Sequence, residues 1–231
     1  MRILKYFLSH FFFILFGGKG KFSVLKKDTV IIKKNVISNS LCEKLITTFE
    51  AKILDKKQKY LWTDDHESDV RLSGFEKYFP DLEQKLDIKK IIKSIDKYTG
   101  TTTKDWFLML NKVVVKKGSK GSGGGWHRDS VYTHQVKVIW YLNDVNKKNG
   151  PLSLVTKSHV SRIKLRNEIP ITTQRFHKYR GSFITLIAPK GTQIIFDASC
   201  LHRGMPVEKG KRYALTLYTT PFKDALKKYH N

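Results

Sequence analysis

Four residues, three of them in two short stretches, have the chemistry to hold a metal ion and a small dicarboxylate. His127 and Asp129 lie in the run Gly-Gly-Gly-Trp-His-Arg-Asp, and His202 lies in Cys-Leu-His-Arg-Gly, ten residues before Arg212. Two imidazoles and one carboxylate are typical of a non-haem iron(II) centre, in which the protein occupies one face of the metal and leaves the other open. A planar guanidinium binds a carboxylate through two hydrogen bonds, so Arg212 fits the anchor of a dicarboxylate co-substrate.

The spacing of the first two ligands fits an extended backbone. Side chains two residues apart on a strand leave the same face, so His127 and Asp129 can contact one ion. A His-x-Asp triplet alone is a weak signal in a chain with 8 histidines, and its context strengthens it. The context is a glycine-rich approach made of Gly118, Gly121, Gly123, Gly124 and Gly125.

Two other cations lie near Arg212 in the sequence, namely Arg203 and Lys211. Residues 211–220 alternate as a strand does, which puts Arg212 on one face together with Ala214 and puts Lys211 on the opposite face. This alternation favours Arg212 over Lys211 for binding the co-substrate, and Arg203 stays open as a nearby cation.

The first 21 residues differ from the rest of the chain. Residues 3–16 are nearly all apolar, and a run rich in Gly and Lys follows. As a helix this segment is about 21 Å long, shorter than the ~30 Å hydrocarbon core of a bilayer, and no small-residue cleavage site is evident. We expect peripheral membrane contact through residues 3–16. A segment packed on the domain and a signal peptide stay open as alternatives.

Residues 22–231 are predicted to form one domain in which helices precede most strands. An extended run covers 29–37. The sequence Ser-Leu-Cys-Glu at 40–43 has the form of a capping box and predicts a helix that ends near Leu54. Residues 56–80 are polar and predict a loop, and apolar residues at helical spacing predict a second helix over 82–98.

From Trp106 onward the pattern becomes that of short strands separated by turns. The predicted strands are 106–116, 126–132, 136–143, 152–156, 183–188, 192–197 and 211–220. Such a series after two helices predicts a mainly β fold with flanking helices, a double-stranded β-helix or jelly roll with the helices packed on one side.

Composition bounds the class of protein. Hydrophobic content of 40% over 231 residues fits a globular chain with a real core. The two cysteines, Cys42 and Cys200, match no zinc or disulfide spacing, which favours a reducing compartment such as the cytoplasm. The formal net charge of +24 favours anionic partners, while its spread along the chain leaves a purely compositional origin open.

Two longer segments resemble the phytanoyl-CoA dioxygenase-like branch of the iron(II)/2-oxoglutarate oxygenases. Residues 141–159 contain Asp-x4-Asn-Gly-Pro-Leu-x5-Ser-His, the stretch that follows the His-x-Asp strand in that family. Residues 191–204, Gly-Thr-Gln-Ile-Ile-Phe-Asp-Ala-Ser-Cys-Leu-His-Arg-Gly, are similar to the later strand that brings the distal His. The resemblance runs from about Asn35 to Phe222 in the order of elements.

This resemblance implies roles for particular residues. The iron(II) ligands would be His127, Asp129 and His202, and Arg212 would bind the distal carboxylate of 2-oxoglutarate, with O2 as the second co-substrate. Asn111 and Trp140 are weaker candidates for flanking the co-substrate. Either residue fits an ordinary strand position equally well, and for Trp140 core packing is the favoured alternative.

Two further comparisons within the resemblance narrow the reaction. Related halogenases have a small residue where this chain has Asp129, so its carboxylate favours oxygenation. Nucleic-acid demethylases have a second Arg six residues after the first, where this chain has Tyr218, so nucleic acid is not an expected substrate.

The connection between the strands predicted at 152–156 and 183–188 is strongly basic. Its cationic and imidazole residues, against the single acid Glu168, are Lys157, His159, Arg162, Lys164, Arg166, Arg175, His177, Lys178 and Arg180. In such folds this stretch tends to overhang the mouth of the active site, which favours an anionic substrate, small or lipid-linked. A solvated loop without that role is the alternative.

The sequence therefore predicts an iron(II)/2-oxoglutarate-dependent dioxygenase that hydroxylates a small or lipid-linked anionic molecule. We expect it in the cytoplasm, with a possible association with the inner face of a membrane. The competing hypothesis is a catalytically silent basic jelly-roll module that binds nucleic acid or acidic membrane surfaces. The complete set of three ligands and Arg212 argues against that alternative, since a binding module needs none of them.

Overall fold

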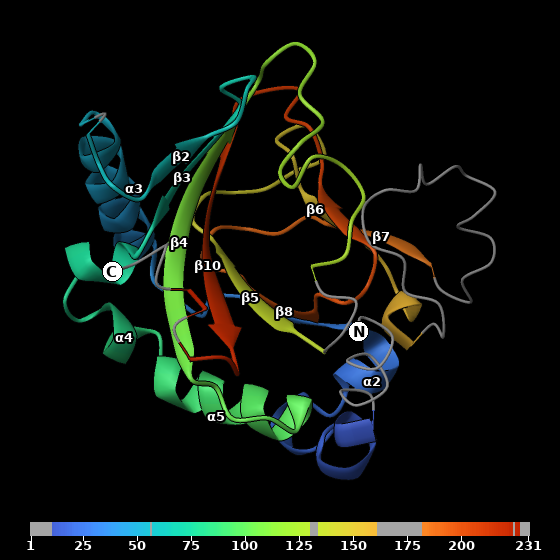
Figure 1. Ribbon diagram of the computed structural model, residues 1–231. Helices are drawn as coiled ribbons and strands as arrows, with labels where there is room; N and C mark the ends of the chain where they lie inside the picture. Colours follow the sequence, from blue (N-terminus) through green and yellow to red (C-terminus); the bar gives the residue numbers. More distant parts are fainter. Residues whose placement is uncertain (1–10, 56, 130–133, 161–181, 224, 227–231) are drawn as a thin grey trace.

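Strands arranged in two antiparallel sheets dominate the computed structural model, which describes residues 11–55, 57–129, 134–160, 182–223 and 225–226 (Figure 1). The larger sheet has the strand order β1-β8-β5-β10-β4-β3-β2, and the smaller has the order β7-β6-β9. The strands are β1 (Val30–Lys33), β2 (Leu61–Thr63), β3 (Asp69–Ser73), β4 (Asp105–Val114), β5 (Val136–Tyr141), β6 (Leu152–Val155), β7 (Phe183–Leu186), β8 (Gln193–Asp197), β9 (His202–Gly204) and β10 (Lys211–Thr220).

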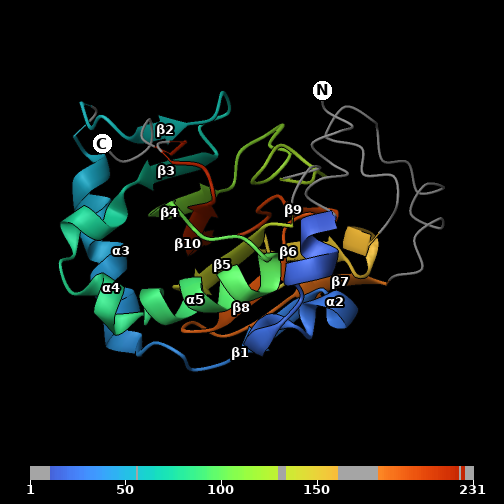
Figure 2. The same cartoon turned by 60° about the horizontal axis from the view of Figure 1, so that its bottom comes forward.

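Helices cover one face of the larger sheet (Figure 2). They are α3 (Asn39–Ile53), α4 (Leu82–Lys85) and α5 (Ile88–Thr99), while α2 (Leu25–Asp28) leads into β1. Single 3-10 turns occur at Gly20–Phe22, Phe75–Tyr78 and Ser158–Val160. The mainly β jelly roll with helices on one side, predicted from the sequence, is confirmed.

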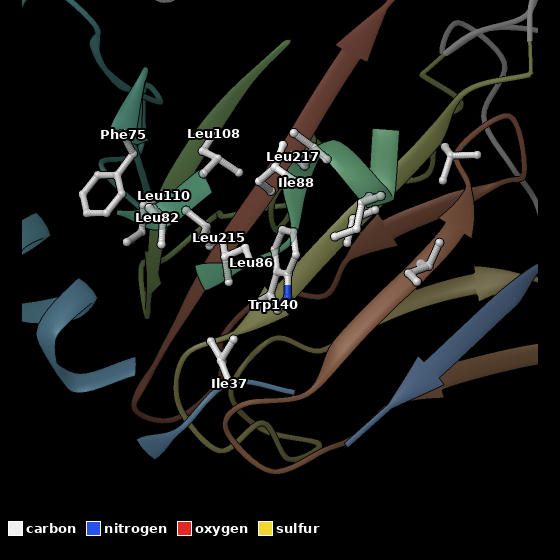
Figure 3. Packing of buried hydrophobic residues seen from close by; sticks show 14 of the residues in the cluster. Ile37, Phe75, Leu82, Leu86, Ile88, Leu108, Leu110, Trp140, Leu215 and Leu217 are labelled. Carbon is white, nitrogen blue, oxygen red and sulfur yellow. The ribbon is translucent and has the colours of Figure 1, made fainter. Parts of the chain in front are cut away.

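The two faces of the larger sheet bury two separate sets of apolar side chains. On the helix side, Leu108, Leu110 and Leu215 pack against residues of α4 and α5 such as Leu82 and Ile88 (Figure 3). On the other face, the space between the two sheets is filled by Tyr141, Val145, Leu152, Leu154, Leu186, Ala188, Ile194, Phe196, Ala198, Cys200 and Ala214. This second set ends where polar side chains take over the space between the sheets, and that is where the candidate site lies.

The prediction of a loop over 56–80 is wrong at 61–63 and 69–73, where β2 and β3 form and extend the larger sheet beside β4. The hydrophobic signal is weak because the polar side chains of β3 face the interior of the jelly roll. Asp69 and Arg71 point into the space between the sheets, whereas Leu72 points to the helix side and is completely buried. An assignment based on hydrophobic residues therefore takes a strand with a polar inner face for a loop.

The single helix predicted over 82–98 is in fact two helices, α4 and α5. Asp87 separates them with a left-handed backbone (φ 52°), which Asp tolerates better than most residues. Both Leu86 and Ile88 are buried, and residues two apart cannot lie on one face of a continuous helix. The break lets both side chains reach the core.

Helix α3 begins slightly before the predicted position. The Ser38 hydroxyl accepts a hydrogen bond from the backbone N–H of Leu41 at 3.2 Å, so Ser38 is the N-cap and the capping box expected from Ser40 does not form. The C-terminal end at Ile53 agrees with the prediction.

Candidate metal centre

Of the strand predicted over 126–132, residues 130–132 lie outside the described part of the chain, and the described residues 126–129 form no regular strand. An isolated β-bridge joins His127 to His202 of β9, with both N–H···O distances at 3.0 Å. The N–H of Asp129 donates to the Ala198 carbonyl at 3.1 Å. These few bonds keep the backbone extended, and the buried Arg128 lies on the opposite side, where it donates to the carbonyl oxygen of Ser158.

The three candidate ligands converge as predicted. One ligand atom from each of His127, Asp129 and His202 can be chosen so that all three lie within 4.8 Å of one another. The Nε2 atom of His127 is 3.5 Å from Oδ1 of Asp129, and Nε2 of His202 is 3.6 Å from Oδ2 of the same carboxylate. Three donors at this separation can share one ion between them.

Backbone carbonyls fix the orientation of both imidazoles. Nδ1 of His127 lies 2.8 Å from the carbonyl oxygen of Gly125, and Nδ1 of His202 lies 3.0 Å from that of Cys200. Because a carbonyl oxygen only accepts, each Nδ1 is the donor, and each Nε2 then carries the free lone pair. Both lone pairs are available for a metal on the side of Asp129.

Glycine is required at two positions around this centre. Gly123 has φ +87°, and a Cβ on it would overlap the His127 ring. Gly204 lies between Ser122 and Arg212, where a Cβ would be 2.8 Å from the Ser122 Cβ and 3.1 Å from a guanidinium nitrogen. Part of the glycine-rich approach therefore serves to bring the backbone close to the ligands.

The charges around the centre favour the metal-binding protonation states. Burial raises the pKa of Asp129, but Lys137 and His202 outweigh that effect and hold it well below the ordinary value. Burial lowers the pKa of His202 to about 3, in spite of the nearby Asp129. A carboxylate and a neutral imidazole are the forms that bind a divalent metal, so no proton needs to leave either group near neutral pH.

Lys137 is a buried cation that the sequence analysis did not single out. Its Nζ lies 2.5 Å from Oδ2 of Asp129 and 4.8 Å from the centre of the Tyr218 ring. Burial lowers the pKa of Lys137, but Asp129 and Tyr218 together raise it above the ordinary value. The alternation of side chains along β5 could have predicted this position, because it puts Lys137 on the same face as Ile139 and Tyr141, inside the jelly roll.

Arg212 lies in the same cavity as the three ligands and is 5% exposed. It donates to the Gly150 carbonyl, and its Nε has no hydrogen-bond partner in the described part of the chain. Ala214 and Thr216 line the same cavity, whereas Tyr213 packs on the helix side, so the predicted alternation of this strand is confirmed.

A second guanidinium, that of Arg71, lines the cavity from β3 and also escaped the sequence analysis. Asp69 pairs with it at 3.0 Å through Nε, and the same carboxylate accepts a bond from the Asn111 amide at 3.1 Å. The guanidinium also lies over the Trp62 ring at 4.6 Å. Asn111 thus lines the cavity, as expected for a residue beside the co-substrate, and Asp69 holds it in place.

The cavity has a volume of ≈ 160 Å³, and both polar and apolar side chains line it. Trp140 is not among its lining residues: it is completely buried on the helix side of the larger sheet, beside Leu86 and Leu215 (Figure 3). The alternative reading of Trp140 as a core residue therefore holds, and its expected place beside the co-substrate is wrong. Tyr141, the next residue, points into the cavity instead.

Most of the basic connection expected to overhang the mouth of the site lies at 161–181, outside the described residues. Of its residues that are described, His159 is completely buried and its Nδ1 is 3.2 Å from the Thr29 hydroxyl. That position removes His159 from the set of candidate substrate-binding cations. Lys157 is exposed, on a left-handed backbone with φ 60°.

Comparison with known proteins identifies the family. The family model described as phytanoyl-CoA dioxygenase (PhyH) matches residues 29–212, well over half of the chain. The chain belongs to the phytanoyl-CoA dioxygenase family. Membership makes it an iron(II)/2-oxoglutarate-dependent oxygenase that uses O2 and acts on small molecules. No protein in a search of curated sequences matches the chain.

Solved structures of low sequence identity share the fold of this phytanoyl-CoA dioxygenase family member. The epimerase SnoN, in complex with Fe3+, alpha ketoglutarate and nogalamycin RO, has a TM-score of 0.65 at 11% identity, covering 86% of this chain and 81% of SnoN. EctD from S. alaskensis with bound Fe has a TM-score of 0.63 at 14% identity (88% and 78% covered). A Pseudomonas putida prolyl-4-hydroxylase has a TM-score of 0.58 at 13% identity (87% and 96% covered).

The described residues contain no helix both long and apolar enough to cross a bilayer. The predicted division into an apolar segment at 1–21 and a domain at 22–231 stays a prediction. Phe13, within the first part, packs on the body of the domain against Tyr98.

Proposed function

We propose that this oxygenase holds iron(II) with His127, Asp129 and His202, binds 2-oxoglutarate with Arg212, and hydroxylates a small anionic substrate. One observation carries the proposal: three convergent donor atoms share a single cavity with a buried guanidinium that forms no ion pair among the described residues. A buried metal-ligand set and an anion anchor in one cavity are the two parts that a keto-acid oxygenase needs.

The donor set fits iron(II). Nε2 of His202 is buried and has no hydrogen-bond partner among the described residues, a state that costs free energy unless a metal binds that atom. Two imidazole nitrogens and one carboxylate oxygen provide three protein ligands and leave three positions of an octahedral ion for other molecules. Held by these residues, iron(II) would supply the chemistry by which O2 converts 2-oxoglutarate to succinate and CO2 and inserts its other oxygen atom into a C–H bond of the substrate.

The remaining groups of the chain position the two carboxylates of the co-substrate. Arg212 supplies a cation near the N-terminal end of β10, beside Gly150 and Gly204. Arg71 and Asn111 line the same cavity as Arg212 and the metal ligands, and Asp69 restrains both of them. Holding the co-substrate at both ends fixes its orientation before the substrate arrives.

The charge balance of the cavity supports an anionic substrate. In the chain by itself, Lys137 pairs with Asp129. Iron(II) adds two positive charges there, and the coordinated end of 2-oxoglutarate removes one, while the distal carboxylate is matched by Arg212. One positive charge then stays uncompensated near Lys137 in a buried site, where it attracts a negatively charged group strongly.

Anaerobic titration of the protein with iron(II) and 2-oxoglutarate tests the metal site. We expect the visible charge-transfer absorption of an iron(II)–keto acid complex. The separate variants His127→Ala and His202→Ala should lose it, because each removes one of three ligands. The matched control is His66→Ala, which removes an exposed histidine outside the cavity and should leave the absorption unchanged.

The proposed ligand set fails if the wild type develops the absorption and both variants keep it. A wild type that gives no absorption and forms no succinate with any compound would instead favour the silent basic module.

Succinate formation from 2-oxoglutarate, measured over a panel of metabolites, tests the charge of the substrate. The panel pairs each carboxylic or phosphoric acid with its neutral ester or amide. We expect turnover with acids only, and at saturating iron(II) we expect Lys137→Met to raise KM for the accepted acid at least tenfold. Equal turnover of acids and neutral partners would contradict an anionic substrate without affecting the metal site.

A further inference from the structure

The helical residues 11–16 expose a nearly continuous apolar surface. Five of their six side chains are between 46% and 63% exposed. We define the apolar helix face as Phe11, Phe12, Ile14, Leu15 and Phe16. Large apolar side chains that cluster on the outside of a protein mark a surface that another molecule or a membrane covers.

The sixth residue, Phe13, fixes this helical segment to the domain. Its ring is 7% exposed, stacks on His134 with 3.6 Å between ring centroids and meets the Tyr98 ring edge to face at 5.4 Å. The following backbone continues the attachment, because Gly18 donates to the Tyr98 carbonyl at 2.5 Å. The segment is therefore held on the domain with its apolar helix face pointing away from it.

The chain next to the apolar helix face is positively charged. Residues 11–27 contain Lys19, Lys21, Lys26 and Lys27 and no acidic residue. The N–H of Lys19 donates to the carbonyl of Lys97 at 3.2 Å, which sets the C-terminal end of α5 beside the segment (Figure 2). The C-terminal half of that helix adds the exposed Lys93 and Lys97.

We propose that the apolar helix face and its neighbouring lysines dock this oxygenase onto an anionic membrane surface. Burial of the apolar side chains at the level of the lipid headgroups and attraction of the lysines to acidic lipids are the two signals that together give stable peripheral binding. The proposal goes beyond the proposed enzymatic function and does not depend on it.

A second copy of the chain fits this surface less well. Pairing two apolar helix faces would bring eight lysines of residues 11–27 close together, in a protein whose formal net charge is already +24. Like charges oppose such a contact, whereas an acidic lipid surface neutralises them. Charge complementarity therefore favours an anionic membrane over a second copy of the chain as the partner of this surface.

Flotation of the full chain with lipid vesicles tests the proposal. The vesicles are phosphatidylcholine alone, or phosphatidylcholine with about a third phosphatidylglycerol, so the acidic lipid is the only difference. We expect the wild type to float with the acidic vesicles and at least tenfold less with the neutral ones. Combined Phe12→Ser and Phe16→Ser should reduce the partition coefficient at least tenfold, and so should combined Lys19→Gln, Lys21→Gln and Lys27→Gln.

Leu54→Ser is the matched control, since Leu54 is an exposed apolar residue (82%) at the end of α3, and it should bind vesicles like the wild type. Melting curves and the iron(II)–2-oxoglutarate absorption of every variant show whether the domain and its metal site are intact. The proposal is overturned if the wild type floats with neither vesicle, or if the Phe variant floats equally well. It is also overturned if sedimentation shows a dimer that only the Phe variant loses.

Discussion

Asp129 has two possible partners, a metal ion and the Lys137 ammonium. In the chain alone its Oδ2 atom pairs with Nζ of Lys137 at 2.5 Å, while the two imidazoles face the same carboxylate. A buried carboxylate that already has a counterion must share its charge when a divalent ion enters. At the scale of single residues, we therefore expect the proposed metal ion and Lys137 to compete for one carboxylate.

Lys137→Met should tighten metal binding several-fold, because the metal no longer competes with an ammonium for Asp129. Without metal, the same variant should melt at a lower temperature than the wild type, since Asp129 then stays buried without its counterion. Calorimetric titration with Co(II) and melting curves without metal measure the two effects. Weaker Co(II) binding by the variant would mean that Lys137 orients Asp129 for the metal and does not compete with it.

Arg212→Met should weaken 2-oxoglutarate binding by about 2 kcal/mol, roughly 30-fold, because it removes charged hydrogen bonds to a carboxylate. The dissociation constant from the anaerobic absorption titration measures the loss. Lys211→Met is the matched control: it removes the preceding cation, which stacks on the Tyr213 ring at 5.2 Å on the other face of the strand. Equal losses in both variants would point to a general charge effect and not to a specific anchor.

Strands and helices position these residues. Strands β3 and β5 show why some residues of the site could be predicted from the sequence and others could not. The convergence of His127, Asp129 and His202 was predictable because their side-chain types, taken together with the sequence around them, form a possible set of metal ligands. Arg71 was not, because β3 carries its polar residues on the inside and its apolar residues on the helix side, so its inner face lacks the hydrophobic signal of a strand.

The misassigned role of Trp140 has a similar cause. A strand between a helix layer and a cavity is covered on both faces, so neither face has the polar residues of a solvent-exposed surface. The sequence alone therefore does not show which face meets the cavity. The register of β5 against β10 decides it, because Trp140 opposes Leu215 of the helix-side core and Tyr141 opposes Ala214 of the inner one. Such pairings join segments that lie far apart in the sequence.

Trp140→Phe should lower the free energy of unfolding by about 1–2 kcal/mol, because it leaves a small void in a fully buried site. The affinity for 2-oxoglutarate should stay within twofold of the wild type. Chemical denaturation and the absorption titration measure the two quantities. A large loss of affinity for 2-oxoglutarate with little loss of unfolding free energy would instead indicate that Trp140 contacts the co-substrate.

The end of β8 carries a buried carboxylate that links several elements. Asp197 accepts hydrogen bonds from the hydroxyls of Tyr98 at 2.8 Å and Ser199 at 2.6 Å, and pairs with Nδ1 of His134 at 2.5 Å. Burial raises the pKa of Asp197, but His134 outweighs that effect and holds it well below the ordinary value. This carboxylate therefore stabilises the contact between α5 and the larger sheet in its charged form.

Asp197→Asn should cost about 3 kcal/mol of stability at pH 7. Because the folded pKa lies below the unfolded value of about 3.9, the contribution of the charge is complete above that value and is lost as the pH falls toward the folded pKa. The difference in melting temperature between wild type and variant should thus be constant from pH 7 to 5 and shrink below pH 4. A difference that grows as the pH falls would contradict this sign.

For the molecule as a whole, loading of the site should couple to global stability. The residues proposed to bind the metal come from segments separated by about 70 positions and are joined through the bridge between His127 and His202. Unfolding separates them, so any ion bound to the folded protein alone stabilises the entire fold.

At a Co(II) concentration about 100-fold above its dissociation constant, the gain is about 2.7 kcal/mol, which corresponds to an increase of roughly 5–10 °C in Tm for a chain of this size. Differential scanning calorimetry measures the increase. His202→Ala should remove most of it, and a chelator should reverse it in the wild type. An equal increase in His202→Ala would place the ion elsewhere.

The Phe13 ring also closes the cover over the buried pair formed by His134 and Asp197. A truncated protein that begins after Phe16 would lack the apolar residues 11–16, including Phe13. Water could then reach the His134 imidazole. Such a truncation would gain solubility but remove the ring that stacks on His134, just before β5. Preparations for metal or substrate work should keep Phe13 and replace only its outward-facing neighbours.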